Sequence, residues 1–132
     1  MITLSEENYL KAILSINLNT NNLVSTNEIA NLLNTSAASV SEMIKKLQEK
    51  NLVIYEKYKG VKLSNKGRKK AIEVLRKHRL WETFLVKKLD FSWAEVHDVA
   101  EQLEHIKSRK LTDKLNHFLN YLFYIIIISF FF

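Results

Sequence analysis

The 132-residue sequence contains no cysteine, no proline and only two glycines. Without cysteine the chain cannot form a disulfide, a thiolate zinc site or a cysteine nucleophile. Gly60 and Gly67 stand alone, and neither fits the glycine-rich loops that bind nucleotide phosphates. These absences exclude most nucleotide-handling and thiol chemistry. The length is that of one domain, or of a small domain with an extension.

The charge is unbalanced toward the basic side. Lys and Arg total 20 against 14 Asp and Glu, which gives a formal net charge of +6. An excess of this size suits a polyanionic partner or an anionic membrane surface, without choosing between them. The basic residues concentrate between positions 45 and 70.

Serine and threonine caps divide the chain into helices. Thr3, Ser25 and Ser92 each precede a Glu by three residues, which is the capping-box pattern of a helix start. Ser36, Ser64 and Ser108 are further candidate caps. Apolar spacing predicts helices at about 4–17, 25–33, from 36, 64–89, 92–106 and from 108, the last with Leu111, Leu115 and Phe118 inward.

Between the third and fourth helices the period changes to that of strands. Segments at about 53–57 and 61–63 flank Gly60, which supplies the positive φ of a tight turn. The predicted fold is therefore mainly α. It is an N-terminal winged helix-turn-helix, with three helices and a β-hairpin wing, followed by a helical region.

The third helix has the composition of a DNA-recognition helix. Such a helix needs small or polar residues in its first turn, because bulky apolar side chains would hold its backbone out of the major groove. The winged-helix pattern predicts that double-stranded DNA binds the residues Ser36, Ala37, Ala38, Ser39, Ser41, Glu42, Lys45 and Lys46, and the hairpin tip Lys57, Tyr58 and Lys59. The alternative is that Ser36 is only a cap and the lysines a solvated surface.

His and Glu residues share faces of two predicted helices. His78 and Glu82 are four positions apart on one helix. The next helix carries, at i, i+4, i+7 and i+8, the residues His97, Glu101, Glu104 and His105. If the two helices pack antiparallel, these groups converge, and burying the acids without a cation would be costly. Such ligands suit Mn²⁺, Fe²⁺, Co²⁺ or Zn²⁺, although each residue alone is more typical of a solvated face.

Five segments closely resemble the diphtheria-toxin-repressor family of metal-dependent bacterial repressors, which includes the manganese-transport regulators. They are Glu7-Asn-Tyr-Leu-Lys-Ala-Ile, Ser39-Val-Ser-Glu-Met, Tyr55-Glu-Lys-Tyr-Lys-Gly-Val, Lys77-His-Arg-Leu, and Val96-His-Asp to Leu103-Glu-His, within a resemblance that covers residues 3–119. The resemblance implies a cytoplasmic homodimer that represses metal-uptake genes. It would bind a palindromic DNA operator when loaded with Mn²⁺ or Fe²⁺.

The resemblance also implies two sets of metal ligands. The family's primary site is matched by Glu101, Glu104 and His105, together with Asn8, which stands where the family has Met or Asp. An ancillary site is matched by His78, Glu82 and His97. Iron-sensing members have Cys at the position of Glu101, so a carboxylate there is more similar to the manganese branch. Lys11 replaces a further acid of the manganese regulators, and Ala38 stands where the family often has Pro.

The domain prediction follows from both the sequence motifs and the family resemblance. Residues 1–70 are expected to bind DNA, residues 71–119 to bind metal and to dimerise, and residues 120–132 to form an apolar tail. A metal held between Asn8 and the acids would fix the DNA-binding unit relative to the dimer core. Apolar residues beyond what a small core needs also favour a homodimer; they are Leu80, Trp81, Phe84, Leu85 and Trp93.

Two alternatives belong to other classes. One is a metal-independent winged-helix protein whose His and Glu residues are surface pairs. The other, a metallo-hydrolase, is disfavoured because the chain has no HExxH motif. We expect no enzyme activity, no small organic substrate and no membrane association.

The last twelve residues differ from the rest. Residues 121–132 read YLFYIIIISFFF, with eleven apolar residues and no charge. The stretch is shorter than the ~20 residues that a membrane helix needs. We interpret it as the product of a truncated or frame-shifted gene, and we expect it to favour β-aggregation.

Overall fold

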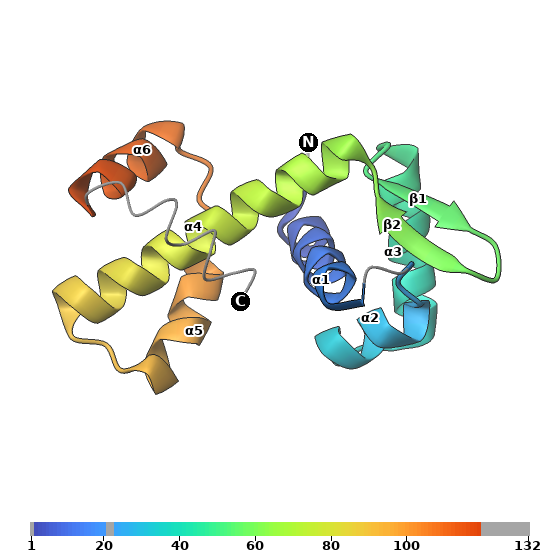
Figure 1. Ribbon diagram of the computed structural model, residues 1–132, viewed down its shortest axis with the longest axis horizontal. Helices are drawn as coiled ribbons and strands as arrows, with labels where there is room; N and C mark the ends of the chain where they lie inside the picture. The colour runs from blue at the N-terminus through green and yellow to red at the C-terminus, as the bar shows by residue number, and fades with distance from the viewer. Residues whose placement is uncertain (1, 21–22, 120–132) are drawn as a thin grey trace. The chain divides into compact units, whose positions relative to one another are not determined.

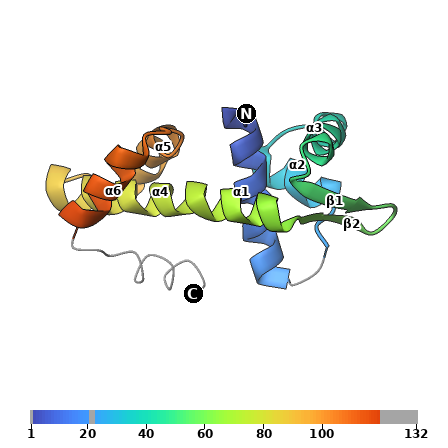
Figure 2. The same cartoon turned by 90° about the horizontal axis from the view of Figure 1, so that it is seen from above.

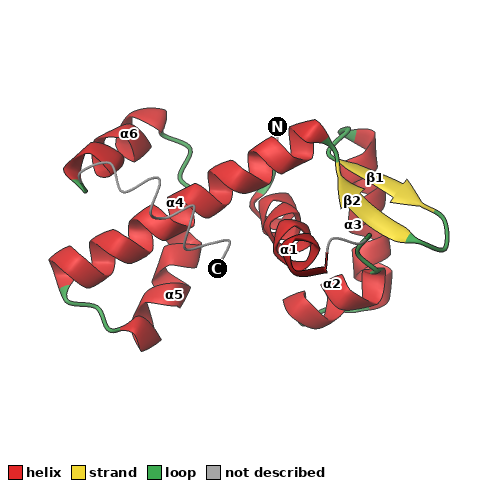
Figure 3. Cartoon of the chain, viewed as in Figure 1, coloured by secondary structure: helices red, strands yellow, loops and turns green. Residues whose placement is uncertain are grey.

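The computed structural model describes residues 2–20 and 23–119 (Figure 1). In chain order the elements are α1 (Leu4–Thr20), α2 (Thr26–Leu33), α3 (Ala37–Glu49), β1 (Val53–Glu56), β2 (Gly60–Leu63), α4 (Asn65–Leu89), α5 (Trp93–Leu103) and α6 (Arg109–Phe118). In the described part of the chain, β1 and β2 are the only strands (Figure 3). The predicted mainly-α fold with a winged helix-turn-helix is confirmed. The apolar segment 121–132 lies outside the described residues.

The helix starts lie at the predicted caps. Thr3 and Glu6 exchange backbone-to-side-chain hydrogen bonds of 2.8 and 3.1 Å, and the capping boxes at Ser25 and Ser92 are complete. The other three hydroxyls accept from backbone N–H groups three residues on: Ser36 from Ser39, Ser64 from Gly67 and Ser108 from Leu111. Each cap satisfies an N–H group that the helix itself cannot.

Two helix ends differ from the prediction. α1 continues to Thr20 rather than ending near residue 17. α5 ends at Leu103 rather than near Ile106, and Glu104 and His105 stand in the turn that follows. Here the N–H of Ile106 donates to the carbonyl of Leu103, and the Lys77 ammonium reaches the carbonyl of Ile106 at 3.3 Å. A contact from α4 therefore satisfies a carbonyl beyond the end of α5. Local sequence pattern does not report such a contact.

The first compact unit comprises residues 1–72. Its core is built from fully buried side chains of the first three helices and the hairpin, among them Leu10, Ile13, Ile29, Val40, Leu47, Leu52 and Val61. The two strands pair antiparallel from Val53 opposite Leu63 to Glu56 opposite Gly60. Val24 extends this pairing through two backbone hydrogen bonds of 2.8 Å with Val61. The hairpin is thus anchored to the start of α2.

Both glycines stand where backbones approach closely. Gly60 has a φ of 125°, and a Cβ there would lie 2.5 Å from the Val24 carbonyl oxygen. At Gly67, in the first turn of α4, a Cβ would lie 1.9 Å from the Leu52 carbonyl oxygen. The predicted positive φ of Gly60 is confirmed. The close approach at Gly67 has no signature in the sequence.

The second unit begins at Glu73. In it α5 and α6 both lie along the C-terminal part of α4 (Figures 1 and 2), and α4 and α6 share a core of Leu80, Leu115 and Leu119. Leu80 and Leu85 are buried in this unit, so they are not the surplus apolar surface that the sequence suggested. Leu111 and Phe118, predicted to point inward, are instead 38% and 55% exposed.

No helix among the residues that the structure describes combines the length and the apolar character needed to cross a bilayer.

A half-buried ion pair joins α1 to the end of α3. The Lys50 ammonium donates to Glu6 Oε1 at 2.8 Å, and the Glu6 side chain is 3% exposed. Burial raises the pKa of Glu6, but hydrogen bonds from Lys50 and Thr3 outweigh it, so the pKa lies below its usual value. Glu6 thus serves at once as a helix cap and as the partner of a distant lysine.

We expect Glu6→Gln to lower the free energy of unfolding at neutral pH by about 1.5–3 kcal/mol, the usual contribution of a buried hydrogen bond to a charged group. Because the native pKa is lowered, this contribution is complete above the ordinary glutamate pKa and is lost as the pH falls through the native one. Urea denaturation followed by circular dichroism measures both effects. Glu95→Gln, which removes an exposed capping-box carboxylate, is the control. An equal loss in both variants would contradict the role of the Lys50 pair.

Candidate functional site

The predicted DNA-binding residues of α3 form an exposed surface. All eight, namely Ser36, Ala37, Ala38, Ser39, Ser41, Glu42, Lys45 and Lys46, are exposed, whereas Val40, Ile44 and Leu47 are buried on the opposite side. The Ser36 hydroxyl also lies 2.9 Å from that of Ser39, which holds the first turn together. The surface has small side chains at its N-terminal end and basic side chains further along, as a helix that enters the major groove requires.

The hairpin tip is exposed as well. Lys57, Tyr58 and Lys59 are all exposed, and Tyr58 is 91% exposed. Tyr58 has a φ of 65°, a left-handed conformation that is unfavourable for a bulky side chain. The Lys57 ammonium lies 5.2 Å from the centroid of the Tyr58 ring, within cation–π range. A cation and an aromatic ring thus project together from the wing.

The second unit brings two histidines and a glutamate together. One ligand atom from each of His78, Glu82 and His97 lies within 4.8 Å of the others, the one such group of His, Cys, Asp or Glu found in the described part of the chain. His78 and Glu82 come from α4, where they are buried, and His97 comes from α5 with its side chain 59% exposed. The two rings meet edge to face with centroids 5.0 Å apart. The cluster therefore has two buried donors, His78 and Glu82, and one exposed donor, His97.

Glu82 is ionised over the whole physiological range. Its Oε2 lies 3.2 Å from His78 Nε2 and 3.8 Å from His97 Nδ1, while Arg79 donates to its Oε1 at 2.7 Å. Burial raises the pKa of Glu82, but hydrogen bonds from His78 and Arg79 outweigh it and bring the pKa down to about 2. A carboxylate with this pKa is available to a cation without first losing a proton.

The remaining predicted ligands continue the cluster on both sides. Glu101, on the exposed side, lies 3.2 Å from His97 Nε2. On the buried side, Glu104 Oε1 lies 2.6 Å from His78 Nδ1, and its Oε2 lies 3.5 Å from His105 Nε2. All six residues of the unit thus form one chain of contacts. Glu101, Glu104 and His105, predicted as one set, do not converge as His78, Glu82 and His97 do in the described structure.

Asn8 lies half-buried on α1, in the first unit. Its role as a ligand stays a prediction, as do the roles of the other six residues.

Arg79 is a member of the site that the sequence analysis missed. It stands three residues before Glu82 on α4, a spacing at which an arginine and a glutamate share a helix face. The i, i+3 spacing was therefore the available signal. Its guanidinium donates to Glu82 Oε1, the oxygen that does not face the histidines. Oε2 therefore remains the oxygen that faces the cluster.

A winged helix-turn-helix joined to a helical unit with a nitrogen and oxygen donor cluster defines a class, the ligand-responsive DNA-binding regulators. Two family models match the chain in succession: iron dependent repressor, N-terminal DNA binding domain, over residues 1–61, and iron dependent repressor, metal binding and dimerisation domain, over residues 64–123. The chain belongs to the iron-dependent repressor family.

Individual relatives agree with this assignment. The chain is 35% identical over 115 residues to an HTH-type transcriptional regulator of Methanocaldococcus jannaschii, covering 87% of this chain and 92% of the relative. It is 36% identical over 92 residues to the iron-dependent repressor IdeR of Mycobacterium leprae, covering 70% and 40%. The predicted family is confirmed, and these matches favour a metal-dependent regulator over a metal-independent winged-helix protein.

Solved structures show the same architecture. The manganese regulator SloR superimposes with a TM-score of 0.78 at 40% identity, covering 88% of this chain and 54% of that one. A manganese-dependent transcriptional repressor in complex with manganese gives 0.80 at 40% identity, covering 88% and 53%. ScaR with bound Zn²⁺ gives 0.75 at 38% identity, covering 88% and 54%. The chain thus spans about half the length of these three solved proteins.

We expect Glu82→Gln to destabilise the metal-free protein by about 2–3 kcal/mol at neutral pH, because it removes the charged acceptor of His78 and Arg79. The native pKa is lowered, so the contribution is present above the ordinary glutamate pKa and is lost as the pH falls toward 2. Urea denaturation in the presence of EDTA measures it. Glu101→Gln, an exposed carboxylate of the same contact chain, is the control and should have a smaller effect; a larger one would contradict the analysis.

Proposed function

We propose that this chain is a repressor of metal-uptake genes that binds a palindromic operator as a homodimer when loaded with Mn²⁺ or Fe²⁺. The observation that carries the proposal is the convergence of His78, Glu82 and His97 in a chain that also presents a winged helix-turn-helix. The DNA-binding role is assigned to residues 1–70, and the metal-binding and dimerisation roles to residues 71–119.

The donor chemistry of the cluster fits a first-row divalent cation. Two imidazole nitrogens and an ionised carboxylate are borderline and hard ligands, without the sulfur that would favour softer ions. His97, half-exposed at the edge of the cluster, gives an ion access to the buried donors. When bound, the ion supplies a positive centre that these groups share. Glu101, Glu104, His105 and Asn8 are proposed as the ligands of a second site, on the resemblance alone.

Metal binding must favour the DNA-binding state to act as a switch. A ligand shifts a conformational equilibrium only by the difference between its affinities for the two states. A dimer on a palindrome must hold its recognition helices about 34–36 Å apart, or a multiple of this spacing. We propose that the metal-loaded second unit holds α3 of each protomer at the required separation. Lys45, Lys46 and the wing lysines then contact phosphates, while the first turn of α3 reads the bases.

We expect duplex DNA selected from a random library in the presence of Mn²⁺ to bind at least about tenfold more tightly with Mn²⁺ than with EDTA, a coupling typical of allosteric systems. Fluorescence anisotropy at fixed ionic strength measures the two affinities. The effect should weaken as the pH falls, because a histidine must be deprotonated to bind the metal.

His97→Ala should remove this metal dependence, and its exposed side chain makes the substitution tolerable for the fold. Asp98→Asn, on the next residue of α5 and also exposed, should retain it. Equal binding of wild-type protein in Mn²⁺ and in EDTA would refute the metal-activated function.

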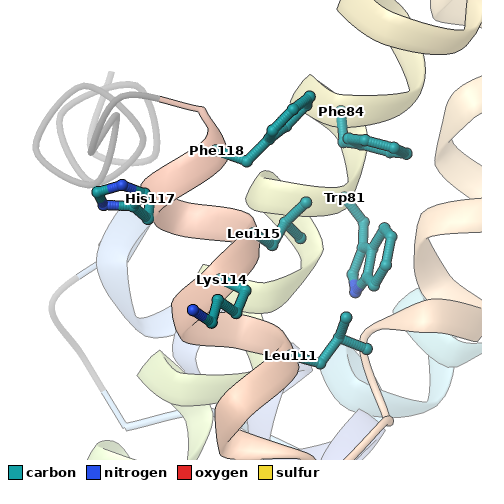
Figure 4. Close-up of a pocket in the computed structure, with 7 residues that line it drawn as sticks. All are labelled: Trp81, Phe84, Leu111, Lys114, Leu115, His117 and Phe118. Atoms are coloured by element: carbon teal, nitrogen blue, oxygen red, sulfur yellow. The ribbon is translucent and has the colours of Figure 1, made fainter.

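The second unit offers an apolar groove for a second copy of the chain. Trp81 and Phe84 of α4 face Leu111, Leu115 and Phe118 of α6 across a groove of about 470 Å³ (Figure 4). Lys114 and His117 lie at its rim, and their side chains turn away from the aromatic residues. The match to a dimerisation domain over residues 64–123 supports a second protomer as the occupant. Burial of this surface would stabilise the dimer.

We expect Phe118→Ser to raise the dimer dissociation constant at least about tenfold, because each protomer loses the burial of one aromatic side chain. Sedimentation velocity at micromolar concentration measures it. Leu32→Ser replaces a side chain exposed to the same degree on α2 and should leave the dimer intact. A monomeric wild-type chain, or an unchanged dimer in Phe118→Ser, would contradict the proposed interface.

A further inference from the structure

The contact between His78 and Glu104 is the shortest and most buried in the cluster. The Nδ1–Oε1 distance is 2.6 Å, and the two side chains are 3% and 0% exposed. The hydrogen bond between these two atoms engages Nδ1 of the ring with Glu104. The pair joins the middle of α4 to the turn that follows α5.

The two nitrogens of His78 face different partners. Nδ1 faces Glu104, whereas Nε2 lies 3.2 Å from Glu82 Oε2, the oxygen that also lies 3.8 Å from His97 Nδ1. Nε2 is therefore the nitrogen that would meet an ion held by the three residues. Glu104 reaches the opposite side of the ring and is not a member of that converging group.

We propose that Glu104 is a positioning residue for His78: in the metal-loaded protein it keeps the imidazole proton on Nδ1, while Nε2, which faces Glu82, gives up its proton to bind the ion. The inference rests on the proposed metal-binding function. It gives Glu104 a role in addition to that of a ligand of the proposed second site. A carboxylate on the far nitrogen of a ligating histidine orients the ring and makes it a stronger donor. Removing such a partner typically lowers metal affinity about 10–100-fold.

The test must separate this role from direct ligation, because Glu104 also lies 3.5 Å from His105. His105→Gln first removes the proposed second site, so that Mn²⁺ titrates the cluster alone. In that background Glu104→Gln should weaken Mn²⁺ binding 10–100-fold in isothermal titration. Asp98→Asn in the same background removes an exposed carboxylate from α5 and should leave the affinity within threefold, on the order of the scatter for exposed charges.

Unchanged Mn²⁺ affinity in Glu104→Gln would overturn the positioning role and leave the metal function intact. If the wild-type chain itself binds no Mn²⁺, the proposed function fails, and this inference fails with it.

A second measurement does not depend on how well the variants fold. In ¹⁵N-labelled wild-type protein loaded with diamagnetic Zn²⁺, long-range ¹H–¹⁵N correlation identifies the protonated nitrogen of His78. We expect a slowly exchanging proton on Nδ1, because that group is buried and hydrogen-bonded, and no proton on Nε2. A proton on Nε2, with the metal on Nδ1, would overturn the inference. A role of Glu104 in folding alone would not select the tautomer.

Discussion

Burial of the Glu104 carboxylate sets the arrangement of the second unit. A charged carboxylate out of contact with water is unstable unless partners compensate for its lost hydration. His78 supplies that compensation from α4 at 2.6 Å, and His105 adds a weaker contact at 3.5 Å. Because the two members of the main pair come from different elements, their contact fixes where α5 ends along α4. That placement brings His97 of α5 over Glu82. The donor cluster is therefore a consequence of how a buried acid is satisfied, and disrupting the acid would alter the geometry of donors that it does not touch.

The first unit keeps its binding surface apart from its stabilising contacts. Its core is apolar, and its half-buried ion pair, Glu6 with Lys50, lies at the ends of α1 and α3. Residues 36–39, at the start of α3, and residues 57–59, at the hairpin tip, contribute no buried side chain. A surface with so little part in folding can change its residues, and hence the base sequence that it recognises, at little expense to stability. The second unit is the reverse case, since His78, Glu82 and Glu104 belong both to the site and to the interior.

Most predictions that depend on local sequence were confirmed, except that α1 runs to Thr20 rather than to residue 17, and the other errors arose where distant contacts decide. The six caps, the hairpin with Gly60 and the order of the helices all follow from residues within four positions of one another. His78 and Glu82 share a helix face for the same reason. The end of α5 did not follow, because the turn after Leu103 is held by contacts with α4, from Glu104 to His78 and from the Ile106 carbonyl to Lys77. The i+7 and i+8 rule placed Glu104 and His105 on a regular helix face, whereas they stand in the turn beyond it. The exposure of Leu111 and Phe118 likewise depends on how α6 lies against α4, which helical periodicity does not specify.

The two glycines have a consequence for how this sequence can evolve. Neither Gly60 nor Gly67 belongs to the donor cluster or to the predicted recognition surface, yet each position meets a backbone oxygen where any other residue would place its Cβ. A backbone atom cannot move aside as a flexible side chain can, so selection should remove nearly every replacement at both positions. In an alignment of sequences that descend from one ancestor, positions 60 and 67 would stay invariant, while the turn of α3 that is predicted to read DNA would diversify. Invariance at Gly60 and Gly67 would then record the closeness of two chain segments rather than chemistry at a binding site.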